Sequence, residues 1–190
     1  MSKRALVVVD LQRDFCAGGA LAVPDGDAVV APINALIAIF RASGDPIFLT
    51  RDWHPADHSS FADQGGLWPA HCVAGTSGAE FHSELVVQDD LTLVSKATER
   101  ESDAYSGFQG TDLRAQLIAA GISEVLVCGL ATDYCVKATA LDAVNAGLAT
   151  TVLTDAIRGV EVQPGDTQGA LDELLAAGVK LADSSSLAWS

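Results

Sequence analysis

The sequence predicts a three-layer α/β protein in which helices cover both faces of a mainly parallel, six-stranded sheet of the doubly wound, Rossmann-like kind. Six short apolar runs, each of strand length, are spaced along the chain. Segments with apolar residues at helical spacing separate most of these runs, and this alternation is typical of parallel sheets. The chain has 190 residues, 49% of them hydrophobic, which is enough to bury one core. We therefore expect a single domain over residues 1–190.

The expected strands are runs rich in valine, leucine and isoleucine, as in strands that are buried on both faces. In chain order they are expected at residues 5–10 (ALVVVD), 46–52, 91–96, 123–130, 149–155 and 179–183. The fourth run (SEVLVCGL) is expected to be the most buried of the six.

Four segments with helical spacing complete the pattern, and they are expected at residues 27–44, 111–121, 133–147 and 166–178. The first has Asp27 as its expected N-cap and Gly44 as its stop, because glycine readily takes the left-handed conformation that ends a helix. Gly121 and Gly147 are expected to end the next two helices in the same way.

One segment, from about residue 53 to residue 90, has no regular hydrophobic period. It is rich in glycine, proline, serine and aromatic residues, and it contains all four histidines of the chain. Long irregular loops inside compact domains tend to be functional or disordered. Because of the histidines we expect a functional loop insertion here.

The chain is acidic, with a formal net charge of −14. Such a polyanion repels phosphate backbones and anionic lipids, so no nucleic-acid or membrane partner is expected. The N-terminal apolar run stops at Asp10, which makes it too short for a signal peptide or a membrane span. The four cysteines form no CxxC pair, as in reduced cytosolic proteins. A cytoplasmic location is expected, and the oligomeric state is open, with a homo-oligomer compatible with the sequence.

Polar side chains follow several of the expected strands. Asp10, Asp52 and Lys96 close the first three, and Cys135 follows the fourth at the start of a helix. Open α/β sheets bind ligands outside the carboxyl ends of their strands, so these groups are expected to meet at one edge. A helix start lowers the pKa of a thiol, Lys96 would lower it further, and Asp10 could accept the proton. The set indicates a cysteine nucleophile, with backbone N–H groups available for an oxyanion.

Structural roles compete with this interpretation. Taken singly, the thiol could pack as a small hydrophobe, the aspartate could cap a turn and the lysine could be a surface charge. Their joint placement at strand ends favours catalysis. Among the other cysteines, Cys128 lies inside an apolar strand and is expected to be inert, whereas Cys16 and Cys72 are weaker rivals near the same edge.

The histidines suggest a metal site. Asp52 and His54 are two residues apart, so on an extended backbone they point the same way. His58 follows after a short turn, and His71 returns in WPAHC. One carboxylate with two or three imidazoles suits Zn²⁺, Fe²⁺ or Mn²⁺. Loop histidines are also common as surface residues, so both interpretations stay open, and His82 is expected to be structural.

Three aromatic residues, Phe15, Trp68 and Tyr105, lie just beyond a strand end or near the long loop. They could wall a pocket for a flat ring. They could equally fill the base of the loops, and the sequence alone leaves both possibilities open.

The segments VVVDLQRDF, RDWHPADH, WPAHC, AYSGF and GLATDYCVKATALDA occur in this order along the chain. In order and spacing they resemble the nicotinamidases, also called pyrazinamidases, of the isochorismatase-like cysteine hydrolases. The resemblance extends from about Ala5 to the last expected strand, and it implies the isochorismatase-like fold. The Asp…Lys…Cys arrangement is shared by the wider superfamily, whereas the Asp-x-His…His motif narrows it to nicotinamidases.

The resemblance implies a role for each matched residue. The catalytic triad would be Asp10, Lys96 and Cys135. The metal ligands would be Asp52, His54 and His71, with His58 at a position that binds metal in some members. The oxyanion hole would be the backbone N–H groups of Ala131 and Cys135, beside a cis peptide between Leu130 and Ala131. The substrate walls would be Phe15, Trp68 and Tyr105. The chain departs from some relatives at Tyr134, where they carry histidine.

The implied reaction converts nicotinamide to nicotinate and ammonia, and it extends to pyrazinamide. Asp10 would take the thiol proton of Cys135, and the thiolate would attack the amide carbon to give a thioester that water then hydrolyses. Lys96 would keep both groups ionised. One divalent metal ion (Zn²⁺ or Fe²⁺, with Mn²⁺ a further candidate) would face the pyridine nitrogen.

Alternatives remain at this stage. Another isochorismatase-like cysteine amidohydrolase would share the triad without needing the metal ligands. A non-enzymatic metal-binding protein would lack an activated thiol, and a redox protein is disfavoured because no resolving cysteine lies nearby in sequence. The metal, the oligomeric state and the preference between nicotinamide and pyrazinamide stay open.

Overall fold

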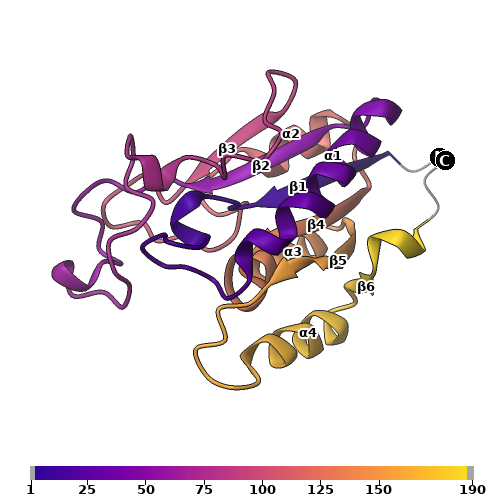
Figure 1. Cartoon of the computed structure of the whole chain (residues 1–190). Coiled ribbons are helices and arrows are strands. Elements are labelled where there is room, and N and C mark those ends of the chain that lie inside the picture. The colour runs from indigo at the N-terminus through magenta and orange to yellow at the C-terminus, as the bar shows by residue number, and fades with distance from the viewer. Residues whose placement is uncertain (1–2, 188–190) are drawn as a thin grey trace.

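The computed structural model describes residues 3–187 and contains one six-stranded sheet (Figure 1). The strands are β1 (Arg4–Val9), β2 (Ile47–Asp52), β3 (Thr92–Lys96), β4 (Glu124–Leu130), β5 (Ala149–Arg158) and β6 (Lys180–Ala182). Their order is β3-β2-β1-β4-β5-β6, and every neighbouring pair is parallel. The predicted three-layer α/β fold is confirmed, with a sheet that is parallel throughout.

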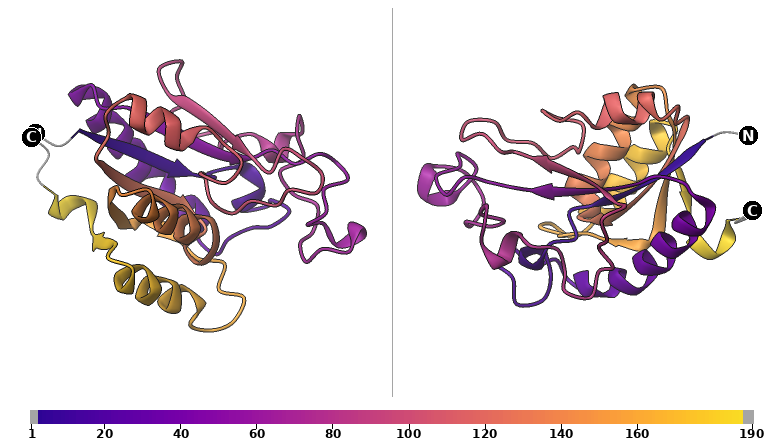
Figure 2. Two further views of the ribbon diagram at one scale, coloured as in Figure 1. Left: turned by 180° about the vertical axis from the view of Figure 1, so that it is seen from behind. Right: turned by 90° about the horizontal axis from the view of Figure 1, so that it is seen from above.

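Helices cover both faces of this sheet. They are α1 (Val30–Ser43), α2 (Leu113–Ala119), α3 (Lys137–Asn145) and α4 (Asp166–Ala176). Leu6 and Val8 of β1 pack in one core with α1, whereas Val7 and Val9 pack in the other core with α2, α3 and α4. Figure 1 shows α1 in front of the sheet, and the reverse view in Figure 2 shows the other three helices. Because alternate side chains enter different cores, β1 is apolar at every position from Ala5 onward.

The predicted N-cap of the first helix is wrong. A 3₁₀ helix, Gly26–Val29, precedes α1, and Asp27 lies inside it. The Asp27 carboxylate instead accepts hydrogen bonds from the Ala17 backbone N–H and from His82 Nε2. Donors from distant segments have replaced the local capping interaction.

Two other helix ends are informative. Gly44 ends α1 with a φ of 71°, as predicted from the left-handed conformation that glycine tolerates. The helix expected from residue 133 begins with a π-helical turn, Thr132–Val136, before α3 starts. Its wider winding is seen in the bond from the Val136 N–H to the Ala131 carbonyl. Such turns are frequent at functional sites.

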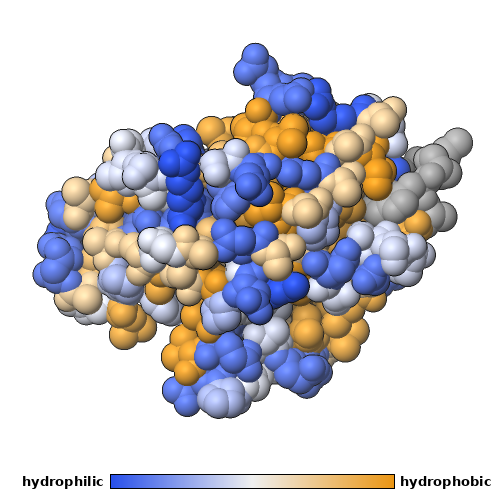
Figure 3. All heavy atoms as spheres, in the orientation of Figure 1, coloured by the Kyte–Doolittle hydropathy of each residue, from blue (hydrophilic) through white to orange (hydrophobic). Residues whose placement is uncertain are grey.

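One helical stretch, Gly26–Ser43, is long and apolar enough to cross a membrane by length and composition. In the fold its apolar residues have another use, because Ile33, Leu36, Ile37 and Phe40 are buried against the sheet. Figure 3 shows hydrophobic and hydrophilic side chains interspersed on this face of the molecule. Packing in the core therefore accounts for the apolar character of α1.

The segment between β2 and β3 lies beyond the arrowheads of the strands (Figure 2). Among the described residues it contains only two short 3₁₀ helices, Ala62–Gln64 and Ser77–Ala79, and isolated bridges. The strand order makes the boundary between β1 and β4 a topological switch point, where open sheets form a crevice. The single domain over 1–190 with a loop insertion at about 53–90 stays a prediction, and residues 1–2 and 188–190 lie outside the described residues.

Candidate active site and metal centre

Lys96 is the charged centre of a buried cluster at this edge of the sheet. Its Nζ lies 3.0 Å from Asp10 Oδ2 and 3.5 Å from Cys135 Sγ, and it donates to Asp52 Oδ1 and to the Ala104 carbonyl at 3.0 Å. Burial lowers the pKa of Lys96, but the two carboxylates outweigh burial and hold it well above its ordinary value. Burial likewise raises the pKa of Asp52, yet Lys96 brings it below the ordinary value. The ammonium therefore keeps its charge by pairing.

Asp10 is fully buried at the end of β1. Thr50 Oγ1 donates to its Oδ1 at 2.6 Å. Its Oδ2 has only the ion-pair contact with Lys96 and no hydrogen-bond partner of regular geometry among the described residues. Burial raises the pKa of Asp10, against the lowering effect of Lys96. Such a carboxylate is a stronger base than an ordinary aspartate, which suits it to accept a thiol proton.

Cys135 lies in the π-helical turn after β4 and lines a pocket. Only 7% of the residue's surface is exposed. Burial raises the pKa of its thiol well above the ordinary value, although Lys96 lowers it. The predicted lowering of this pKa is wrong for the resting site, because desolvation of a thiolate outweighs the helix start and the ammonium. The thiol therefore needs a base within reach. Asp10 and Cys135 belong to a group whose polar atoms lie within 4.8 Å of one another.

The other three cysteines are buried free thiols. Burial raises the pKa of Cys72 and of Cys128, and it raises the pKa of Cys16 to about 12. None of the three lines the pocket into which Cys135 faces. Position and environment thus separate Cys135 from the rivals considered in the sequence.

Asp52, His54 and His71 converge beside this cluster, and all three are buried with ligand atoms within 4.8 Å of one another. Nδ1 of His54 faces the Ala97 carbonyl at 3.3 Å, and Nδ1 of His71 faces the Pro69 carbonyl at 2.7 Å. A carbonyl only accepts, so both rings carry a proton on Nδ1, and in the neutral imidazole Nε2 is then the nitrogen that can bind a metal. This is the usual state of metal-bound histidine, and the residues therefore fit a divalent metal ion.

His58 lies beside this group but outside it. Its ring centroid is 4.2 Å from that of His54. Its Nδ1 lies 2.7 Å from Ser60 Oγ, and its Nε2 lies 3.4 Å from the Ser102 carbonyl. Both nitrogens already have protein partners, so His58 would have to release one of them to bind a metal. Its role as a ligand stays a prediction.

The three aromatic residues expected as walls line the same pocket as Cys135. Trp68 Nε1 donates to Tyr105 Oη at 3.1 Å, and Tyr134 packs edge-on against Trp68 with ring centroids 5.2 Å apart. Phe15, which also lines the pocket, packs against His71 of the metal-ligand group with ring centroids 5.6 Å apart. The pocket thus offers apolar ring surfaces, a thiol and a metal-ligand group to one small molecule.

The backbone at the site takes uncommon conformations. Asp10 (φ 47°), Cys72 (φ 46°) and Ala97 (φ 50°) are non-glycine residues in the left-handed region, and each is a site residue or adjoins one. Such conformations cost stability and persist where the surrounding structure enforces them. The peptide bond between Leu130 and Ala131 is cis, as the resemblance implied, and Ala131 lines the pocket.

Two supporting residues were not predicted from the sequence. The buried amide of Gln12 donates to the carbonyls of Asp52 and Ala79, and it accepts from the Asp52 N–H. Thr50 donates to Asp10, as described above. Thr50 could have been noticed because it lies two residues before Asp52 on the same strand, which places both side chains on one face.

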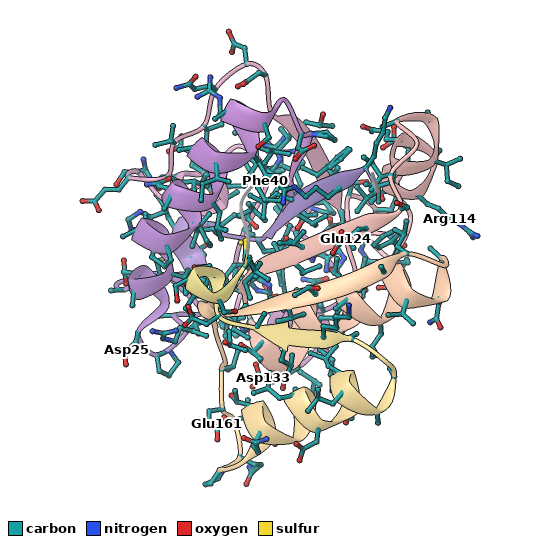
Figure 4. All side chains as sticks on the ribbon, turned by 90° about the vertical axis from the view of Figure 1, so that its right-hand side faces the viewer. Asp25, Phe40, Arg114, Glu124, Asp133 and Glu161 are labelled. Atoms are coloured by element: carbon teal, nitrogen blue, oxygen red, sulfur yellow. The ribbon has the colours of Figure 1, made fainter. Side chains whose placement is uncertain are left out.

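Asp133 was also missed, and it shapes the pocket from a distance. Its carboxylate accepts from the Val160 N–H at 2.9 Å and from the Glu161 N–H at 2.8 Å. Figure 4 labels Asp133 and Glu161, which belong to these adjoining segments. The two bonds hold the segment after β5 so that Val160 lines the pocket.

Known proteins resemble this chain in sequence and in fold. The isochorismatase domain family matches residues 4–186. The chain is 43% identical to the nicotinamidase of Escherichia coli (strain K12), over 95% of each chain. It resembles the pyrazinamidase of Pyrococcus horikoshii solved in complex with zinc, with a TM-score of 0.92 and 48% identity over 95% of this chain and 99% of that one. It also resembles PnC1 from L. infantum solved in complex with nicotinate, with a TM-score of 0.91 and 36% identity over 98% and 96% of the two chains. The chain therefore belongs to the isochorismatase family.

Proposed function

We propose that this protein is a nicotinamidase that hydrolyses nicotinamide to nicotinate and ammonia and also deamidates pyrazinamide. The observation that carries the proposal is the meeting, at one aromatic pocket, of a cysteine backed by a buried aspartate–lysine pair with an Asp/His/His group. Three similar proteins support it: a nicotinamidase, a pyrazinamidase complexed with zinc, and a protein complexed with nicotinate. The substrate is thus a small pyridine carboxamide.

The first half-reaction forms a thioester. Asp10 takes the proton of the Cys135 thiol, and the thiolate attacks the amide carbon. The C–N bond then breaks as Asp10 returns the proton to the leaving nitrogen, which departs as ammonia. Two observations support this assignment: a carboxylate oxygen of Asp10 lies within 4.8 Å of the Cys135 sulfur, and Oδ2 of Asp10 has no regular hydrogen bond among the described residues.

The second half-reaction consumes water. Asp10 accepts a proton from a water molecule, the hydroxide adds to the thioester, and the C–S bond breaks. The sulfur regains its proton, and the acid ionises to nicotinate. Lys96 remains an ammonium throughout and holds Asp10 in place, because two carboxylates raise its pKa. It is a positioning residue as well as a source of positive charge.

Charge on the amide oxygen forms beside the helix start. We assign its stabilisation to the backbone N–H groups of Ala131 and Cys135, since both residues line the pocket. Donors at a helix start carry partial positive charge and are fixed before the reaction, so they need no reorganisation in the transition state. Phe15, Trp68 and Tyr105 would hold the ring.

Asp52, His54 and His71 would hold one divalent metal ion, and their nitrogen and oxygen donors suit Zn²⁺, Fe²⁺ or Mn²⁺. Such an ion, when bound, supplies a Lewis-acid site for the pyridine nitrogen. The protein's part is to fix the ligands: the Ala97 and Pro69 carbonyls orient the two rings through Nδ1. This support is typical of metal centres.

We propose that the reaction takes place in the cytoplasm, because all four cysteines are free thiols, as in reducing compartments. With a formal net charge of −14 the chain repels nucleic acid and anionic lipid, so we also propose that the enzyme acts without either partner. A homo-oligomer is compatible with this proposal.

A substrate comparison tests the function. Metal-replete protein is incubated with nicotinamide, pyrazinamide or benzamide, while ammonia, the carboxylic acid product and the metal content of the same sample are measured. We expect turnover of the first two and much slower turnover of benzamide, which lacks the ring nitrogen. Ammonia release from other amides by a metal-free sample would favour a different cysteine amidohydrolase. Bound metal without turnover of nicotinamide would refute the proposal and favour a metal-binding protein.

A further inference from the structure

A second group of metal-ligating side chains lies outside the active site. Cys16 follows the 3₁₀ helix Arg13–Phe15, Asp27 lies in the 3₁₀ helix before α1, and His82 lies in the segment before β3. Their ligand atoms all lie within 4.8 Å of one another. We propose that Cys16, Asp27 and His82 bind a second divalent ion of the zinc type.

The donor set decides the class of ion. Thiolate and imidazole ligands select zinc and chemically similar ions such as cobalt, whereas magnesium and calcium take oxygen ligands. Three protein ligands leave one position of a tetrahedral zinc ion for water. The same argument separates this group from the active-site group, which offers two imidazoles and a carboxylate but no thiolate of its own.

The three residues differ in solvent exposure, with Cys16 the most buried and Asp27 the most exposed. Cys16 has 2% of its surface exposed, the side chain of His82 has 14%, and that of Asp27 has 44%. They line an open pocket of about 460 Å³. Among the described residues this pocket shares no lining residue with the active-site pocket. An ion could therefore enter from solvent past the carboxylate and meet the thiol last.

The charged groups that line the pocket do not supply a positive partner for a thiolate at Cys16. Arg13 lines it, but its guanidinium is paired with Glu80 at 3.2 Å. Asp14 also lines it, with its carboxylate accepting from the Ala20 and Cys72 N–H groups. A thiolate beside the Asp27 carboxylate would be repelled without a positive partner, and a divalent ion supplies one.

Protons occupy this position in the metal-free chain. His82 Nε2 donates to Asp27 Oδ1 at 3.0 Å, and Cys16 keeps its thiol proton because burial and Asp27 raise its pKa. A metal ion would take the place of both protons, as ligand deprotonation requires. The His82 ring would then carry its proton on Nδ1 and give up the 3.2 Å contact from the Glu84 N–H. Metal binding would thus replace the 3.0 Å and 3.2 Å hydrogen bonds of His82 with three metal–ligand bonds.

Binding here would join the segment of Cys16 and Asp27 to His82, which lies 55 residues after Asp27. Cys16 adjoins Phe15 of the active-site pocket, and Asp27 adjoins the start of α1. The ion would therefore act as a structural link, and it should raise the melting temperature of the protein. This inference does not depend on the proposed reaction, since it would hold for a chain with no turnover of nicotinamide.

Cobalt substitution tests the proposal. The metal-free protein is saturated with Co²⁺, and we measure the ions bound per chain and the sulfur-to-cobalt charge-transfer absorption. We expect two ions per chain and a charge-transfer band. Cys16→Ser should lose the band and one ion, and His82→Asn should lose one ion. Cys135→Ala, which removes the thiol near the active-site group, should keep the band and both ions.

Several results would overturn the proposal. They are a single ion with no band at saturation, a band that survives Cys16→Ser, and a band that only Cys135→Ala removes. A second ion that remains bound in His82→Asn would place it elsewhere and would also overturn the proposal. His82 is partly exposed, so this variant keeps the test decisive if Cys16→Ser does not fold.

Discussion

Replacing Thr50 with valine removes one hydroxyl group from the buried cluster while keeping the size of the side chain. Thr50 and Asp10 have no exposed surface, and the hydroxyl donates to Asp10 Oδ1 at 2.6 Å. A hydrogen bond to a charged group contributes about 1.5–3 kcal/mol, so Thr50→Val should lower the free energy of unfolding by about 2 kcal/mol. The same bond fixes the carboxylate with Oδ2 facing Lys96 at 3.0 Å, and Asp10 lies in one group with the Cys135 thiol. If the whole loss is expressed in the transition state, kcat should fall roughly thirtyfold.

A matched variant isolates this effect. Thr150 on β5 is 4% exposed and donates to the Leu148 carbonyl at 3.1 Å, at the end of the sheet opposite the pocket. Thr150→Val should cost about 1 kcal/mol, as for a neutral hydrogen bond, and should leave kcat unchanged. Urea unfolding and steady-state ammonia release measure both quantities. Equal stability losses in the two variants, with kcat of Thr50→Val unchanged, would refute the role assigned to Thr50.

Three further predictions concern the backbone, a carboxylate and the metal. Gly129 has a φ of 114°, and an added Cβ would overlap the Val9 carbonyl oxygen. Gly129→Ala should therefore lower the free energy of unfolding by at least about 3 kcal/mol. Unchanged stability in urea would contradict this. Bonds from the Thr167 side chain, the Gly165 N–H and the Thr167 N–H hold the pKa of Glu161 below its ordinary value of 4.5. The carboxylate therefore stabilises the fold above that value and loses this effect as the pH falls, so the melting temperatures of wild type and Glu161→Gln should differ at neutral pH and converge in acid. Parallel curves would argue against it. Exhaustive chelation should abolish nicotinamide hydrolysis and added divalent ion should restore it, whereas full turnover at a metal content near zero would disprove the assignment of Asp52 and its histidine partners.

The sheet could be predicted from the sequence because its strands are buried on both faces. In β1 alternate side chains enter two different cores, which makes the run apolar throughout and distinguishes it from an amphipathic strand. The start of α1 could not be predicted in the same way. Asp27 has a capping residue's chemistry, but its carboxylate bonds to Ala17 and His82, and no local pattern contains those contacts.

The candidate site could be predicted to the extent that it follows from topology. Parallel strands end at one edge, so Asp10, Asp52 and Lys96 were expected to meet, and the structure brings them together around one ammonium. The thiol pKa could not be predicted, because it depends on how deeply Cys135 is buried rather than on its place at a helix start. The helix start acts over a turn, whereas desolvation reflects the whole surrounding fold.

The partners of single polar residues were also beyond the sequence. Histidine spacing in the long loop does not show which ring nitrogens face carbonyls, and this is what separates His54 and His71 from His58. Likewise, the presence of glutamine at position 12 does not show that its amide bonds to both the carbonyl and the N–H of the Asp52 backbone. The contacts of His54, His58 and Gln12 join residues 40 to 44 positions apart and arise only when the strands are assembled.

The most direct test of the central claim is the release of ammonia and nicotinate from nicotinamide by wild-type protein and by Cys135→Ala at equal metal content. The wild type should release the two products in equal amounts. Cys135→Ala should release neither, while its unfolding transition and metal content match those of the wild type. Ammonia release by Cys135→Ala at the wild-type rate would contradict a mechanism through a thioester on Cys135.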